Sequence, residues 1–226
     1  MFFILLHNYG CSRKPEYSNH LIQKDEEHFK NLRQLTFSGE NAEAYFSSDG
    51  KNLIFQAHDG DGLCDQIYIM DIATGSAEMV STGNGVTTCS YFQYPDNDGI
   101  IYASTHLADS NCPPKPDYSM GYIWKLYEGY DIFKASMDGS NLQRLTDTPG
   151  YDAEATFSFD GRKIIYTSLE SGDLDLWTMN PDGSGKQQLT NKLGYDGGAF
   201  YSYDGSKIVW RAFYPESKKN ITDYET

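Results

Sequence analysis

The stretch Phe157–Ser168, FSFDGRKIIYTS, reads as a strand, a turn and a second strand. Its Asp160-Gly161 pair stands between two runs of alternating apolar and β-branched residues. That pattern predicts a hairpin with a type I′ turn, because such a turn needs positive φ. The next stretch, Asp173–Thr190 (DLDLWTMNPDGSGKQQLT), has the same character around its own Asp-Gly pair. The two stretches together predict a unit of four short antiparallel strands.

The same marks recur at a nearly constant period along the chain. Asp160 and Asp204 lie 44 residues apart, and Thr36 and Ser81 lie 45 residues apart. Helical repeats also occur at this length, but the dense Gly, Asp and β-branched content disfavours helices. Four antiparallel strands in a repeat of this length are typical of a β-propeller blade. We therefore expect an all-β chain whose four-stranded antiparallel blades form a β-propeller.

About four blades are covered. The expected units are residues 37–81, 82–146, 147–190 and a partial unit at 191–226. The second unit carries an insertion at about 105–129. Before the first unit, Asn31–Thr36 matches the outer fourth strand of the other units, so we expect it to complete the last blade. The tail after Phe213 reads as the opening of another long loop.

The strings FSFDGRKIIYTS, DLDLWTMNPDGSGKQQLT and YDIFKASMDGSNLQRLT (Tyr130–Thr146) resemble the TolB-like β-propeller repeat, a WD-like repeat of bacterial envelope proteins. The resemblance covers Asn31 to about Phe213 and implies a periplasmic or cell-envelope location. Members of this family close with more than four blades, so it also implies that 31–226 is a fragment with an incomplete ring. A compact four-bladed ring with a defective last blade is the alternative.

The first 30 residues lie outside the repeat. Residues 1–11 contain the apolar run Phe2–Leu6 followed by Gly10-Cys11, which fits a clipped lipoprotein signal with lipidation of Cys11. The alternative is a ragged start with a chance cysteine. Residues 12–30 are polar and read as a tether with a short helix at His20–Lys30. Since no run of about 20 apolar residues occurs, we expect no transmembrane segment.

Charge and motifs restrict the function. The chain has 18 basic and 32 acidic residues, a net charge of −14. This argues against nucleic acid and anionic lipid as partners, because both require basic surfaces. No Gly-x-Ser-x-Gly elbow, His-Glu-x-x-His motif or phosphate-binding loop occurs. We therefore expect a protein that is not an enzyme, with no cofactor and no metal.

A candidate binding site follows from aligning the repeats. The first strands of blades line the central channel, and there Glu43 and Glu154 occupy equivalent positions, with Cys89 and Gly198 in the same column. Four carboxylates are expected to ring one channel mouth: Glu43, Asp152, Glu154 and Asp196. Such a ring would suit a cation, a basic peptide or an ordered partner segment. The alternative is that these carboxylates cap backbone amides at the turns.

The insertion is expected on the same face as this mouth, where His106 and Trp124 become candidate partner contacts. The face also carries Cys64, Cys89 and Cys112. One disulfide among the three cysteines is the first expectation, as suits an oxidising compartment. Buried free thiols are the second possibility, and a zinc site that adds His106 is the third, although its spacing matches no common zinc pattern.

The sequence thus favours a non-catalytic propeller of the envelope that binds a protein or peptide partner through the channel-mouth face. The resemblance leaves an alternative open, because similar propellers precede peptidase domains and gate their substrates. The chain would then be the gating part of a larger hydrolase. A catalytic metal in the channel, as in propeller-type oligogalacturonate lyases, is disfavoured because those enzymes depend on channel histidines.

Overall fold

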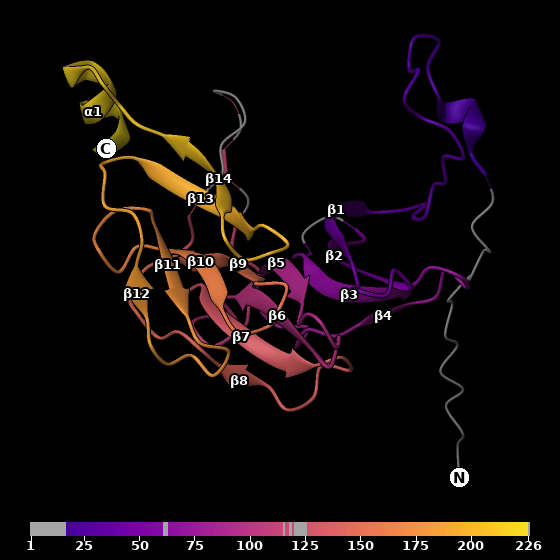
Figure 1. Ribbon diagram of the computed structural model, residues 1–226, viewed down its shortest axis with the longest axis horizontal. Helices are drawn as coiled ribbons and strands as arrows, with labels where there is room; N and C mark the ends of the chain where they lie inside the picture. Colours follow the sequence, from indigo (N-terminus) through magenta and orange to yellow (C-terminus); the bar gives the residue numbers. More distant parts are fainter. Residues whose placement is uncertain (1–16, 61–62, 115, 118, 120–125, 226) are drawn as a thin grey trace.

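Four antiparallel β-sheets follow one another along the chain in the computed structural model, which describes residues 17–60, 63–114, 116–117, 119 and 126–225. The first three sheets have four strands each, and every strand pairs with its neighbour in sequence. The fourth has two strands within the described residues. Figure 1 shows the sheets succeeding one another from β1–β4 to β13–β14.

The strands are short, as the repeat requires. The first sheet comprises β1 (Glu40–Phe46), β2 (Asn52–His58), β3 (Gln66–Asp71) and β4 (Ala77–Met79). The second comprises β5 (Thr87–Phe92), β6 (Gly99–Ser104), β7 (Asp131–Ser136) and β8 (Gln143–Arg144). The third comprises β9 (Asp152–Phe157), β10 (Ile164–Ser168), β11 (Asp175–Met179) and β12 (Gln187–Gln188), and the fourth β13 (Tyr195–Tyr201) and β14 (Ile208–Phe213).

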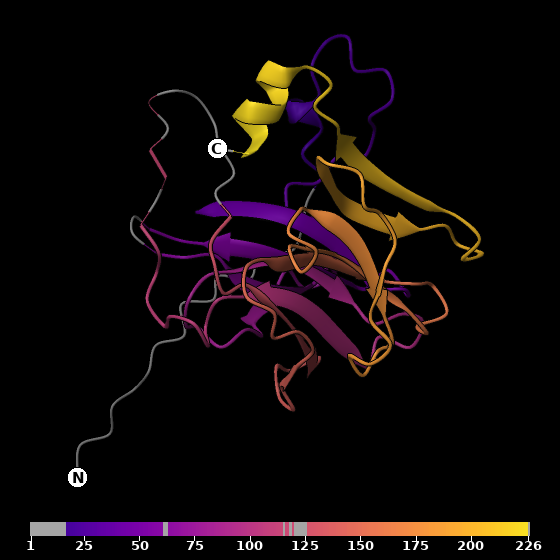
Figure 2. The ribbon, with the colours of Figure 1, turned by 90° about the vertical axis from the view of Figure 1, so that its left-hand side faces the viewer.

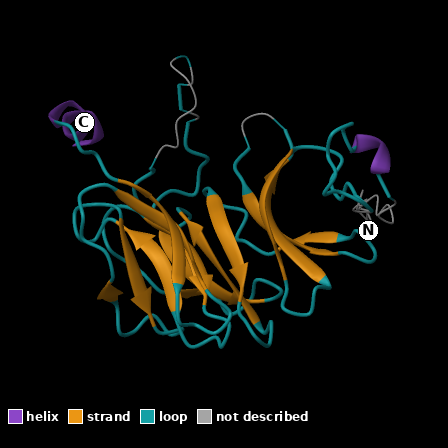
Figure 3. Cartoon of the chain, turned by 45° about the horizontal axis from the view of Figure 1, so that its top comes forward, coloured by secondary structure: helices purple, strands orange, loops and turns teal. Residues whose placement is uncertain are grey.

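The sheets are propeller blades. Their first strands contact one another in turn, β1 with β5, β5 with β9 and β9 with β13, while the fourth strands form the outer edges. This arrangement, seen from a second side in Figure 2, confirms the predicted all-β propeller of four-stranded blades. The ring of sheets is not closed. Among the described residues, helix is confined to η1 (Asn19–Leu21) and α1 (Lys218–Glu225), as Figure 3 shows.

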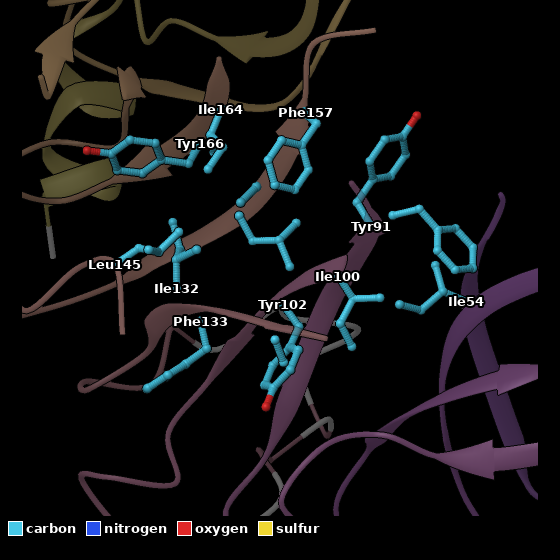
Figure 4. Close-up of a cluster of buried hydrophobic side chains, with 14 of the residues drawn as sticks. Ile54, Tyr91, Ile100, Tyr102, Ile132, Phe133, Leu145, Phe157, Ile164 and Tyr166 are labelled. Atoms are coloured by element: carbon cyan, nitrogen blue, oxygen red, sulfur yellow. The ribbon is translucent and has the colours of Figure 1, made fainter. Parts of the chain in front are cut away.

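The core lies between the blades. Strands β6 and β10 are buried along their whole length, because each lies in a blade with a neighbour on both faces. Ile100, Tyr102 and Ile164 are no more than 1% exposed and belong to one cluster that spans the first three blades (Figure 4). Burying one such side chain stabilises the fold by about 2 kcal/mol. Strand β14, in the last sheet, is exposed along most of its length.

The Asp-Gly turns have a different geometry from the one predicted. The Ser47 hydroxyl donates to Asp49 Oδ1 at 2.7 Å, Asp49 Oδ1 accepts from the Lys51 amide at 3.1 Å, and the Gly50 amide donates to the Ser47 carbonyl at 2.9 Å. Only the glycine has positive φ, 69°, whereas a type I′ turn needs it at both central residues. The type I′ prediction is therefore wrong. The same bonds recur at Ser158–Gly161 and Ser202–Gly205.

A second repeated mark, an aliphatic residue before Ser or Thr, ties the outer strand to the blade. The Thr146 hydroxyl accepts from the Ile132 amide at 2.9 Å, and the Leu145 amide donates to the Ile132 carbonyl at 2.8 Å. The equivalent hydroxyl acceptors and amide donors are Ser81 with Ile67 and Thr190 with Leu176. The hydroxyl completes the pairing where the very short outer strand ends.

The two ends of the chain differ from the sequence expectations. Asn31–Thr36 forms no fourth strand, since the described part of the last sheet offers no third strand to pair with it. Leu35 instead packs on the apolar face of the first blade. The helix expected at His20–Lys30 is reduced to η1. After β14 the chain forms α1, where the Tyr224 hydroxyl donates to Asp173 Oδ1 at 2.6 Å. No described helix is long and apolar enough to cross a membrane.

Candidate functional site

Four equivalent residues, one from each blade, turn the first strands into bulges. Their φ values are all positive: Glu43 at 50°, Cys89 at 53°, Glu154 at 56° and Gly198 at 60°. Each lies where the pairing of its strand with the next one shifts register. A left-handed backbone costs a residue with a Cβ about 1 kcal/mol or more. Because three blades have this conformation at a residue with a Cβ, the surrounding structure must hold the backbone there.

These four residues line one cavity of about 400 Å³. Its floor includes the rings of Tyr45 and Phe200, each two positions further along its strand, and Tyr91 packs against both from outside the lining. The ring of Tyr45 lies 5.2 Å from Tyr91 and 5.7 Å from Phe200, and the last two are 5.9 Å apart. Trp210 and Arg211 of β14 complete the wall. The cavity is therefore a pocket with an acidic rim and an aromatic floor.

Glu154 is held by its own protein. Its Oε2 accepts from the Thr167 hydroxyl at 2.8 Å, from the Tyr195 hydroxyl at 3.0 Å and from the Gly198 amide at 2.9 Å. Its Oε1 accepts from Arg211 at 2.7 Å. The side chain is 13% exposed, against 70% for that of Arg211. Glu154 thus caps a backbone amide of the next blade, and this amide lies in the bulge of β13 and not at a turn, where the alternative reading of the carboxylates expects capping.

The Gly197-Gly198 pair makes room for this network. A Cβ on Gly197 would collide with Glu154 Oε2 and the Tyr195 hydroxyl. A Cβ on Gly198 would stand 2.8 Å from Arg211 Nε, at a φ that disfavours side chains in any case. The glycines at this point of the repeat are therefore required by the side chains of the neighbouring blade and of β14.

Glu43 is different, because its side chain remains exposed at the rim. Partial desolvation in the concave site raises the pKa of Glu43, and the nearby charge of Glu154 raises it further. Hydrogen bonds from Cys89 and the charge of Arg211 act in the opposite direction. Burial also raises the pKa of the Cys89 thiol well above its usual value, so Cys89 stays neutral. Glu43 is the carboxylate of the pocket that a ligand can reach.

A pH-dependent stability follows from Glu43. Because its pKa is raised on folding, its contribution is fully present below the ordinary value of 4.5 and is lost as pH rises through the folded pKa. We expect Glu43→Gln to gain stability relative to the wild type as pH rises from 4.5 to 7. Urea unfolding at the two pH values measures this. Glu78→Gln, at an exposed site on β4, is the control. If the stability difference between Glu43→Gln and the wild type is the same at pH 4.5 and pH 7, the prediction is contradicted.

The other two predicted carboxylates do not line this pocket. Asp152 is 1% exposed and accepts from the Thr148 hydroxyl at 2.7 Å. Asp196 is fully buried, and its Oδ1 accepts from Trp210 Nε1 at 2.8 Å and from the Tyr214 hydroxyl at 2.7 Å. Both side chains are bound by other groups of the protein, so the structure brings together Glu43 and Glu154 but leaves Asp152 and Asp196 out of the acidic rim.

The candidates from the insertion are also separate. His106 packs on Phe133 of β7 with ring centroids 4.3 Å apart, and burial followed by the charge of Arg144 lowers its pKa. It therefore lies toward the outer strands of its blade and not in the pocket. Trp124 and Cys11 lie outside the described residues. Leu126, at the end of the insertion, lines an adjoining cavity of about 430 Å³ together with Tyr195.

The cysteines resolve into one pair and one single thiol. Cys64 and Cys112 form a disulfide with Cα atoms 5.4 Å apart, which joins the β2–β3 connection to the insertion of the second blade. Cys89 is a buried free cysteine. The pairing removes two thiolates from the alternative zinc site. No group of three or more His, Cys, Asp or Glu residues in the described part of the chain is arranged to hold a metal ion.

No prediction from the sequence covers two wall residues of the pocket, Trp210 and Arg211, or Tyr195 of the adjoining cavity. Arg211 pairs in register with Gly197 across β13 and β14. The residues that pair in this way in the other blades are Gln56, Ala103 and Thr167. Since these four side chains share no chemistry, the repeat gives no signal for the position. The sequence offered one indication of Arg211, namely a basic residue on the strand that follows Gly197-Gly198.

These blades, arranged around a shared pocket, define a β-propeller of four-stranded repeats. The similarity to known proteins agrees: the chain has the fold of TolB-like β-propellers. No protein-family model matches it. The Tol-Pal system proteins TolB of Bordetella pertussis and Bordetella parapertussis are 56% identical to it over 34 residues, which is 15% of this chain and 8% of theirs.

Solved structures show the same fold. TolB from Acinetobacter baumannii has a TM-score of 0.54 at 21% identity over 81% of this chain and 46% of its own. Hydrazine synthase of Kuenenia stuttgartiensis has 0.58 at 12% identity over 80% and 30%. A nidogen/laminin complex has 0.56 at 14% identity over 75% and 55%. The chain thus spans about half the length of the Acinetobacter TolB structure.

Proposed function

We propose that this chain is a binding propeller of the bacterial periplasm or cell envelope that holds a protein or peptide partner by a basic side chain in the pocket of Glu43. One observation carries the proposal: Glu43 keeps an exposed carboxylate at the rim of a cavity whose aromatic floor is formed by Tyr45 and Phe200. The apolar stem of a lysine or arginine can pack on these aromatic rings while its charged end pairs with the Glu43 carboxylate.

Charge and similarity support the same reading. The net charge of −14 attracts cationic segments over long range. The similarity to a Tol-Pal system protein supports a protein partner and an envelope location. Glu154 has a positioning role in this proposal, because its oxygens are occupied by groups of the protein. Lipidation of Cys11 and a role as the gate of a peptidase stay predictions.

The experiment titrates the full chain with a short peptide that carries one lysine in a neutral sequence and follows the fluorescence of Trp210, which lines the cavity. We expect saturable binding that Glu43→Gln weakens by about tenfold, the effect of losing about 1.4 kcal/mol of charge-assisted interaction. Glu78→Gln is the control and should bind as the wild type does. Equal binding by Glu43→Gln would refute the proposed site.

A further inference from the structure

The end of the axis away from Glu43 carries a second pocket of about 420 Å³, built from turns of all four blades. Ser48 of the first blade, Tyr94 of the second, Phe159 and Asp160 of the third and Tyr203 of the fourth contribute to its lining. These lining residues come directly after the first strands of their blades, whereas Glu43 lies within strand β1. The layer of Tyr45, Tyr91 and Phe200 stands between the two sites.

Three aromatic rings form a continuous surface there. Tyr94 and Phe159 have centroids 5.3 Å apart, and Phe159 and Tyr203 have centroids 5.0 Å apart. Tyr94 is fixed, since it is 9% exposed and its hydroxyl donates to the Phe46 carbonyl at 2.7 Å. Tyr203 is 83% exposed at a turn. An aromatic ring this exposed, at the end of a row of packed rings, presents its π-face to solvent.

Carboxylates lie at the turns that carry these rings. Asp160 lines the pocket, and Asp49 and Asp204 hold the same turn position in other blades. Hydrogen bonds from Ser47 and Ser202 are the main reason that the pKa of Asp49 and of Asp204 falls to about 2. The Ser158 hydroxyl and the Arg162 amide both donate to Asp160 Oδ1, which fixes the carboxylate, and Oδ2 lies 3.9 Å from Nε of the exposed Arg162.

We propose that this turn-face pocket binds an arginine side chain of a partner protein, with the guanidinium stacked on Tyr203 and Phe159 and paired with Asp160. A planar guanidinium can stack on an aromatic ring and donate to a carboxylate in the same pose. A lysine ammonium offers no planar surface and is more strongly hydrated, so it fits the site less well. The inference is independent of the proposed function, because the aromatic layer separates the two pockets.

The test is an NMR titration of the full chain that follows the amides of Gly50, Gly161 and Gly205. The probes are a blocked pentapeptide with two arginines separated by glycine and its lysine counterpart. We expect saturable shifts at these turns with the arginine peptide and binding about tenfold weaker with the lysine peptide, a difference of about 1.4 kcal/mol. Chito-oligosaccharide is a third probe, because sugar rings also stack on aromatic side chains.

Two variants locate the binding site. Tyr203→Ala and Asp160→Asn should each weaken arginine binding at least about fivefold, since one removes the stacking surface and the other the charge. Both positions are exposed, so the fold should tolerate the changes. Asp138→Asn is the matched control, an aspartate at the β7–β8 connection whose Oδ1 also accepts from one serine hydroxyl and one backbone amide, both of Ser140. Glu43→Gln should leave this binding unchanged.

Three results would overturn the inference. Equal binding of the arginine and lysine peptides, insensitive to Tyr203→Ala, would reduce the effect to general charge attraction. Shifts that depend on Glu43 and not on Asp160 would assign the peptide to the other pocket. Saturable binding of chito-oligosaccharide with no response to the arginine peptide would make the turn face a carbohydrate site.

Discussion

Replacing both disulfide cysteines, as in Cys64→Ser/Cys112→Ser, is expected to lower the free energy of unfolding by about 4 kcal/mol. The bond joins residues 48 positions apart, and closing a loop of that length removes much of the entropy of the unfolded chain. It also ties the first blade to the insertion of the second. Urea unfolding of the oxidised protein and of the variant measures the difference.

The matched control is the wild type under reductant, which should unfold at the urea concentration of the variant. The variant itself should not respond to reductant, because Cys89 is buried and unpaired. If the wild type unfolds at one urea concentration with and without reductant, the bond contributes nothing to stability and the prediction fails.

The second large effect is expected at Glu154. Glu154→Ala should cost about 3 kcal/mol, because it leaves the fully buried Thr167 hydroxyl, the Tyr195 hydroxyl and the Gly198 amide without their acceptor. The exposed Arg211 adds little to this sum, since its ion pair is screened by solvent. Glu154→Gln keeps an acceptor oxygen, so it should lose only about 1 kcal/mol.

A third variant separates the side chain from the backbone. Alanine retains the cost of the positive φ at this position, whereas glycine does not. Glu154→Gly should therefore be about 1 kcal/mol more stable than Glu154→Ala. Thermal and urea unfolding of the three variants give the order. A Glu154→Gly variant less stable than Glu154→Ala would show that the left-handed backbone is not strained.

The blades could be predicted from the sequence because each repeated mark has a local physical cause. The Ser-x-Asp-Gly turns recur with the same hydrogen bonds at Ser47, Ser158 and Ser202. The column of Glu43, Cys89, Glu154 and Gly198 could be predicted for the same reason, since equivalent positions in repeats occupy equivalent places around an axis.

The rest of the site depends on contacts between blades that no repeat encodes. The repeat predicts Asp196 in the acidic rim, but its carboxylate is buried and accepts hydrogen bonds from Trp210 and Tyr214. The matching positions of the other blades carry no basic residue, so the repeat could not predict that Arg211 lines the pocket. The turn type was also missed, because the serine that reshapes the turn acts through its side chain.

The bulge column also bears on how such a protein diversifies. Every blade delivers one residue to the same pocket, and three of the four carry a Cβ in spite of the unfavourable backbone. One codon change at Glu43, whose side chain is exposed, can therefore alter the chemistry of the pocket while the strands stay as they are, whereas a change at Glu154 also removes hydrogen bonds of the fold. Duplicated copies of this gene that differ at Glu43 can thus acquire new partners without a loss of fold.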